Sequence, residues 1–143
     1  MKELEYPFDA AYIIKKRKSL KKALLADGTS RIRKKIAVFG GSTTSDIVKT
    51  LELFLLDAGI EPEFYESEYA QYFQDAMFPD ETLLSFKLDI VFIHTTNRNV
   101  TNWPEMTDTT EQIDEKLHTE INRFTAMWKS IAEKFHCPII QNN

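Results

Sequence analysis

Apolar positions along the chain follow two spacings, one typical of buried strands and the other typical of amphipathic helices. Short apolar runs at residues 35–40, 88–94 and 138–141 predict strands that are buried on both faces of a parallel sheet. Residues 61–66 predict a further strand, and Pro62 near its start favours a place at the edge of the sheet.

Helical spacing separates these strands. The pattern predicts helices at about residues 9–26, 44–58, 69–78, 80–86 and 108–135. In the last and longest helix an apolar residue recurs every three or four positions, at Ile113, Leu117, Ile121, Phe124, Trp128, Ile131 and Phe135. Residues 95–107 show no periodicity and contain Trp103-Pro104, which predicts an unusually long loop.

This alternation of helix and strand predicts an α/β fold. We expect a three-layer, flavodoxin-like arrangement, in which a parallel sheet carries helices on both faces. A basic helix and linker over residues 1–34 precede the α/β domain proper, which we place at residues 35–143.

Composition narrows the class of protein. The chain has 143 residues, 43% of them hydrophobic, and a net charge of −4, as is ordinary for one globular domain. Cys137 is the single cysteine, which excludes an internal disulfide and a cysteine-rich zinc site. No apolar run approaches the roughly 20 residues of a membrane span and no signal peptide opens the chain, so we expect a cytoplasmic protein that does not contact a membrane.

The net charge hides an asymmetry along the sequence. Residues 1–36 carry 11 basic and four acidic residues, or +7, whereas residues 37–143 carry seven basic and 18 acidic residues, or −11. The favoured interpretation is a solvated helix face that complements its own acidic body, and the alternative is a docking surface for an acidic partner. No aromatic residues interleave these lysines to stack bases, which argues against nucleic acid as a partner.

A polar turn follows the first strand, at Gly40, Gly41, Ser42, Thr43 and Thr44. Backbone N–H groups at such a strand-to-helix turn suit an anion or an exposed nucleophile, and the glycines let a ligand approach closely. The alternative, which this turn by itself favours, is that its hydroxyl residues only cap the following helix.

A second polar turn follows the third strand, at His94, Thr95, Thr96, Asn97, Arg98 and Asn99. Parallel strands end at the same edge of a sheet, so we expect the two turns to share a crevice. There the Asn97 amide is suited to an oxyanion and Arg98 to a phosphate or carboxylate. The alternative is that Asn97 and Asn99 shape a turn while Arg98 pairs with an acidic residue.

Several common sites are absent from the sequence. Gly-Gly-Ser-Thr-Thr lacks the lysine of a P-loop and the third glycine of a dinucleotide fingerprint. The acidic pair and phosphoacceptor aspartate of a receiver domain are replaced by Gly40-Gly41 and Thr95-Thr96. We expect no metal site in these residues.

The two turns, the Glu-Pro-Glu-Phe-Tyr-Glu strand at residues 61–66 and the closing Cys-Pro-Ile-Ile-Gln-Asn together resemble the N-terminal domain of FkbH-like proteins. The resemblance covers the chain from about Arg17. In that family this domain is similar to SGNH (GDSL-like) hydrolases. It precedes a haloacid-dehalogenase-type (HAD) domain of subfamily IIIC. Members of the FkbH-like family serve polyketide and capsular polysaccharide biosynthesis.

The resemblance implies roles for individual residues. Ser42 stands at the position of the SGNH nucleophile and Asn97 at that of the oxyanion-hole asparagine, with Gly40, Gly41, Thr43, Thr44, His94, Thr95, Arg98 and Asn99 around the substrate. The usual Gly-Asp-Ser is Gly-Gly-Ser here, and no Asp-x-x-His pair occurs before Asn143. Serine without a base is a poor nucleophile, so we expect these residues to be inactive as an esterase by themselves.

Two functions follow from the resemblance. The first is a binding domain that presents an acyl or glyceryl intermediate, or its acyl carrier protein, to a HAD-type phosphatase or transferase domain in the same chain. The alternative is an SGNH-type acyl hydrolase or acyltransferase that uses Ser42 with a histidine beyond residue 143. Both imply a piece of a longer multidomain protein, without a cofactor in these residues and with Mg in the HAD domain.

Overall fold

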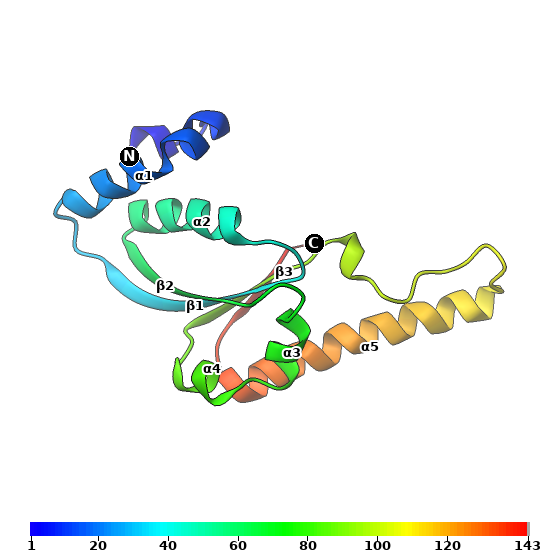
Figure 1. The fold of residues 1–143 in the computed structure, drawn as a ribbon. Helices are drawn as coiled ribbons and strands as arrows, with labels where there is room; N and C mark the ends of the chain where they lie inside the picture. Colours follow the sequence, from blue (N-terminus) through cyan, green and yellow to red (C-terminus); the bar gives the residue numbers. More distant parts are fainter. Residues whose placement is uncertain (143) are drawn as a thin grey trace.

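A four-stranded parallel sheet forms the centre of the computed structural model, which describes residues 1–142 (Figure 1). The strands lie in the order β2-β1-β3-β4, and their bounds are β1 (Ile32–Gly40), β2 (Ile60–Glu66), β3 (Ile90–His94) and β4 (Ile139–Gln141). The predicted α/β class, the parallel sheet and the place of β2 at an edge are all confirmed. The first strand begins at Ile32, three residues before the start predicted from its apolar run.

β1 is central, and its apolar half is covered from both sides. Residues 36–40 are all buried, which explains why this segment is a continuous apolar run rather than an alternating one. In the register of the sheet, Val38 lies opposite Glu66 and Gly40 lies opposite His94. The carboxyl ends of β1, β2 and β3 are therefore level with one another.

Helices α2 (Ser45–Asp57) and α1 (Ala10–Ala26) lie above one face of the sheet (Figure 1). α2 contacts the sheet, and α1 packs on the outer side of α2. Their interface is a small core of buried leucine and isoleucine side chains from α1, α2 and the turn η1 (Lys2–Leu4), namely Leu4, Ile13, Leu20, Leu24, Leu53 and Leu56. The basic helix is thus an additional layer on the α/β fold.

The opposite face is covered by α3 (Tyr72–Met77), α4 (Glu81–Ser85) and α5 (Thr110–Phe135) (Figure 1). Their apolar side chains meet Ala37, Phe39, Val91 and Ile93 of the sheet in the main core. Helices on both faces confirm the predicted three layers. α3 starts later than predicted, because Ala70 adopts a left-handed backbone conformation with φ 61° and Gln71 is the helix N-cap.

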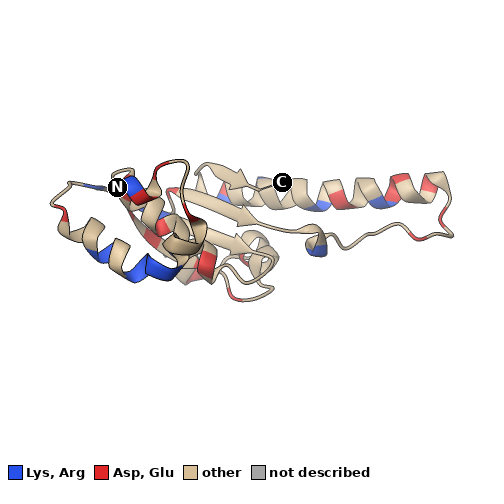
Figure 2. Ribbon diagram, turned by 90° about the horizontal axis from the view of Figure 1, so that it is seen from above, with Lys and Arg blue, Asp and Glu red and all other residues tan. Residues whose placement is uncertain are grey.

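The amino-terminal half of α5 extends beyond the sheet, with the preceding loop beside it (Figures 1 and 2). We call residues 100–121, the loop and this half of the helix, the α5 arm. The predicted long loop is confirmed except for one short turn, η2 (Asn97–Asn99). Thr109 is the N-cap of α5, where its side chain accepts a hydrogen bond from the Gln112 N–H.

Ion pairs connect the basic N-terminal segment to the acidic body, as the favoured interpretation of the charge pattern predicts. Five of its eleven basic residues pair with the body: Arg17 with Asp46, Lys21 with Glu52, Arg33 with Glu61, Lys34 with Asp89 and Lys35 with Glu63. Arg31 pairs with Asp27 inside the segment itself. Lys15, Lys16, Lys18 and Lys22 on α1 are exposed and have no ion-pair partner within residues 1–142. Among the described helices, none is long and apolar enough to cross a membrane.

Candidate functional site

The candidate site is the carboxyl edge of the sheet, where open α/β folds bind their ligands. We use "carboxyl edge" for residues 40–44 after β1, 66–67 at the end of β2, 94–99 after β3, and Asn142 after β4. Direct hydrogen bonds join these four segments. The two polar turns predicted to meet do so, because the Gly41 N–H donates to the His94 carbonyl at 2.8 Å.

The first turn depends on two close approaches. A Cβ at Gly40 would lie 2.3 Å from Thr44 Cγ2, and a Cβ at Gly41 would lie 2.3 Å from the Asn99 amide nitrogen. Neither gap admits a methyl group, so both glycines are required for packing. Ser42 follows them and is half-buried, while Thr43 is exposed.

Asn99 holds the second turn against the first. Its amide nitrogen donates to the Gly41 carbonyl at 2.9 Å, and its amide oxygen accepts from the Thr96 N–H at 2.8 Å. Asn97 and Arg98 occupy the same short helical turn with exposed side chains. Asn99, rather than Asn97, is therefore the asparagine that joins the two loops.

The end of β4 closes the edge on the other side of Thr95. The Asn142 side chain accepts from the Thr95 N–H at 2.9 Å and donates to the Thr95 carbonyl at 2.8 Å. Gln141 donates to the Thr95 hydroxyl at 3.1 Å. These contacts give the buried Thr95 a structural role.

β2 supplies a carboxylate that the sequence did not single out. The buried Thr44 hydroxyl donates to Glu66 at 2.9 Å and thus joins the start of α2 to the end of β2. The Ser67 N–H donates to the Val38 carbonyl at 3.1 Å, which continues the pairing past the strand. Thr44 therefore fixes this part of the edge by a side-chain contact to a neighbouring strand rather than by capping its own helix.

The ion pair of Arg123 and Glu120 on α5 contacts the second turn, residues 94–99. Arg123 donates to the Asn99 carbonyl at 2.7 Å and bonds to Glu120. Glu120 also accepts from the Thr101 N–H at 3.2 Å and from the Asn102 amide at 2.9 Å. Burial alone would raise the pKa of Glu120, but the hydrogen bonds from Arg123, Asn102 and Thr101 outweigh it and lower that pKa to about 2.

The carboxyl edge presents the side chains of Ser42, Thr43 and Asn97 as hydroxyl and amide groups that are at least partly accessible. Within residues 1–142 no histidine or carboxylate is hydrogen-bonded to the Ser42 hydroxyl, and the His94 ring lies against Phe92, with 6.2 Å between ring centroids. Ser42 therefore has no base to take its proton. The described residues also contain no cluster of three or more His, Cys, Asp or Glu side chains that fits a metal ion.

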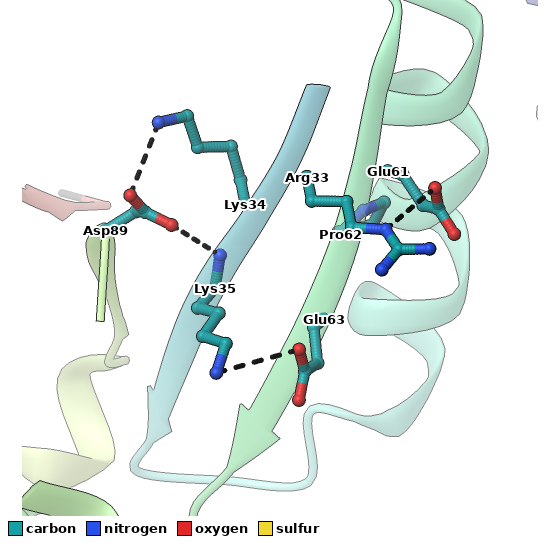
Figure 3. Close-up of a pocket in the computed structure, with 7 residues that line it drawn as sticks. All are labelled: Arg33, Lys34, Lys35, Glu61, Pro62, Glu63 and Asp89. Atoms are coloured by element: carbon teal, nitrogen blue, oxygen red, sulfur yellow. Dashed lines mark hydrogen bonds and ion pairs between the residues drawn. The ribbon is translucent and has the colours of Figure 1, made fainter. Parts of the chain in front are cut away.

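A pocket of about 560 Å³ lies at the opposite, amino-terminal end of the sheet (Figure 3). Three basic side chains line it, and each is paired with an acidic one: Arg33 with Glu61 at 3.6 Å, Lys34 with Asp89 at 3.3 Å, and Lys35 with Glu63 at 4.0 Å. The charges cancel, and a hydrogen bond from the Lys35 N–H helps to lower the pKa of Asp89. This pocket is a set of cross-strand ion pairs rather than a second ligand site.

Comparison with known proteins gives a match in structure. No protein-family model and no curated protein sequence matches the chain. A similar solved structure is the N-terminal part of the protein BF1531 from Bacteroides fragilis, which contains a phosphatase domain complexed with Mg; the TM-score is 0.65 at 19% sequence identity. The match covers 89% of this chain but 32% of that one, so the chain spans about a third of its neighbour's length. The likeness establishes the α/β fold.

Proposed function

We propose that this chain is the N-terminal binding domain of an FkbH-like, HAD-containing biosynthetic protein. In this role the carboxyl edge holds an acyl or glyceryl intermediate on its carrier and presents it to a phosphatase or transferase domain. The neighbour is likewise the N-terminal part of a phosphatase-containing protein.

The observation that carries the proposal is an ordered polar edge without a general base. Asn99, Thr95 and Thr44 fix the loops by hydrogen bonds, while Ser42 has no partner within residues 1–142 that would activate it. Ordered loops with hydroxyl and amide groups recognise a ligand at little entropic cost, because the loops are already in place. Such an edge supports positioning of a ligand more than cleavage of a bond.

The unpaired lysines of α1 suit the carrier in this proposal. Lys15, Lys16, Lys18 and Lys22 gather on one exposed helix (Figure 2). A basic surface of this kind attracts an acidic protein and accelerates its encounter. The proposed carrier is therefore an acidic acyl carrier protein that docks on α1.

Titration of the ¹⁵N-labelled chain with an acyl carrier protein in its acylated and apo forms, followed by amide shifts, tests the proposal. We expect shifts at residues 40–44 and 95–99 with an acylated carrier, and shifts on α1 with either the acylated or the apo carrier. Lys18→Glu should weaken binding and Lys87→Glu, its exposed control away from α1, should not. No shift at the carboxyl edge with the acylated carrier contradicts the proposal.

The alternative is that Ser42 is an acyl-transfer nucleophile in a longer protein. One observation favours it: Ser42 is half-buried at the strand-to-helix turn, with no hydrogen bond to its hydroxyl within the described chain. Asn97 would then serve the oxyanion, and a histidine would have to come from another segment. Unchanged acyl-transfer activity in a Ser42→Ala variant of the longer protein would exclude this alternative, while loss of that activity would favour it over pure binding.

A further inference from the structure

One side of α5 carries an apolar stripe that is largely exposed within residues 1–142, although its member Phe124 is half-buried against the main core. Its members are Ile113, Leu117, Ile121, Phe124 and Trp128. Ile113 is 40% exposed, Leu117 54%, Ile121 51% and Trp128 41%. Such a run of large apolar side chains on one helix face marks a protein contact rather than scattered surface residues.

Most of the stripe lies on the part of α5 that is not packed against the sheet. Its first three members are on the α5 arm, which extends beyond the sheet (Figure 1). The positions of the arm that do turn inward are polar: Glu120 is buried against Thr101 and Asn102, and Lys116 pairs with Asp108 at 2.7 Å. The loop therefore covers the polar side of the arm and leaves the apolar side open.

The intervals between the residues of the stripe are nearly the same whether they are counted from its first or from its last residue. Its successive intervals are four, four, three and four residues. If a second copy of α5 lies antiparallel, with a two-fold axis near Ile121, Ile113 faces the partner's Trp128 and Leu117 faces the partner's Phe124. Both helices then contribute the same patch, which is the requirement for a closed two-fold dimer.

Charge favours the same orientation. Residues 110–120 of α5 carry four acidic residues and one lysine, or −3, whereas residues 121–135 carry three basic residues and one glutamate, or +2. Figure 2 shows acidic residues near the outer end of the helix. Antiparallel pairing places each acidic half opposite a basic half, and parallel pairing would place like charges together.

One pair of exposed charges also fits this register. Glu111 and Lys129 are 18 residues, or about five helical turns, apart and so lie on the same side of α5. With the axis near Ile121, Glu111 of one copy lies within about 3 Å, measured along the helix, of Lys129 of the other. Within its own helix Lys129 approaches Glu133 only to 3.9 Å.

We propose that the exposed stripe of α5 is the interface of a homodimer in which two α5 helices pack antiparallel around Ile121. The dimer does not rest on the proposed function, because the stripe shares no residue with the carboxyl edge. It gives the apolar side of each α5 arm a partner that residues 1–142 of its own chain do not supply.

Sedimentation velocity over a range of protein concentrations tests the dimer. We expect twice the chain mass of 16.6 kDa at high concentration. Leu117→Glu should abolish the dimer with unchanged circular dichroism, and Ile14→Glu, a control at 56% exposure on α1, should leave it intact. A monomer at about 200 µM, or a dimer that survives Leu117→Glu, overturns the proposal; the monomer would assign the stripe to another chain segment or protein.

Cysteine cross-linking tests the antiparallel register in a Cys137→Ser background. Ile121→Cys should form an intermolecular disulfide, because residue 121 meets its own copy at the axis. Ile113→Cys should not, because the two copies of residue 113 are separated by about 24 Å along the helices and a disulfide bridges Cα atoms at most about 7 Å apart. Self-cross-linking through residue 113 overturns the register.

Charge reversal gives a second measure of the same register. Glu111→Lys or Lys129→Glu should weaken the dimer by about threefold to tenfold, as is usual for exposed ion pairs. The double variant Glu111→Lys/Lys129→Glu should restore the original dissociation constant, because each pair is re-formed with its signs exchanged. Weakening that adds up in the double variant contradicts the pairing.

Discussion

α1 and α5 are both amphipathic helices with a side-chain N-cap, yet they use their apolar faces differently. α1 buries Ile13, Leu20 and Leu24 against α2, so its periodicity corresponds to a core within the chain. α5 buries Met127 and Ile131 where it crosses the sheet, but leaves Leu117 exposed on the arm. The same sequence pattern therefore leads to an internal core in one helix and an open surface in the other.

The difference shows what periodicity can and cannot indicate. An apolar stripe indicates that a helix face is favourable to bury, because removing apolar surface from water lowers the free energy. It does not report which surface covers the stripe. On the arm, polar contacts to Glu120 and Lys116 hold the loop in place, and the apolar side chain of Leu117 stays exposed within the described chain.

The largest effect expected from this contrast is on global stability. Leu24→Ala should lower the free energy of unfolding by about 3 kcal/mol, because it removes a side chain that is 2% exposed and leaves a cavity between α1 and α2. Leu117→Ala should change it by less than about 0.5 kcal/mol, because that side chain is exposed in the single chain. Urea unfolding at about 1 µM, where association is negligible, measures both.

Equal losses from the two leucine substitutions would mean that the stripe is already buried within the chain. Leu20→Ala provides a second α1 variant, at 7% exposure, and should resemble Leu24→Ala. Leu25→Ala, at 52% exposure on the same helix, is the matched exposed control and should resemble Leu117→Ala.

A smaller effect is expected from the polar contacts that hold the arm. Glu120→Gln removes the charge that Arg123 binds, and should lower the free energy of local opening of the arm by about 2 kcal/mol. Hydrogen exchange of the Thr101 amide at pH 7 measures it, with the amides of α1 as the internal control. Loss of protection in α1 as well would show that arm and core open together.

The same carboxylate gives the arm a dependence on pH. The pKa of Glu120 is lowered from 4.5 in the unfolded chain to about 2 in the folded one. Its contribution is therefore complete above about pH 4.5 and is lost as the pH falls toward 2, where the folded carboxylate becomes protonated. Glu120→Gln should remove this part of the acid dependence, and an unchanged acid profile would contradict the assignment.

Most of the fold could be predicted because each strand and helix has a local cause. The continuous apolar run of β1 reflects a strand covered on both faces, and Pro62 reflects the open side of β2. Ala70 is an exception: nothing in its residue type indicates a positive φ, so the late start of α3 could not be foreseen.

The carboxyl edge could be located from the sequence, but the contacts within it could not. Two polar turns after parallel strands indicate the place. The choice of Asn99 over Asn97 as the residue that bonds to Gly41 depends on the path of one short helical turn. Glu66 and Asn142 join the edge through strand register, which no local pattern contains.

The smallest expected difference between the two helices is at their N-caps. Asp9 accepts from the Tyr12 N–H at 3.0 Å, and Thr109 accepts from the Gln112 N–H at 3.3 Å, so each cap satisfies one free donor of its helix. Asp9→Ala should lower the free energy of global unfolding by about 1 kcal/mol, because α1 unfolds together with its core. Thr109→Ala should leave global unfolding within about 0.3 kcal/mol and should instead increase hydrogen exchange in the first turn of α5, because the end of an extended arm frays by itself. Equal global losses for the two caps would show that the arm unfolds with the body, and the exposed stripe would then have to be stabilised within the single chain.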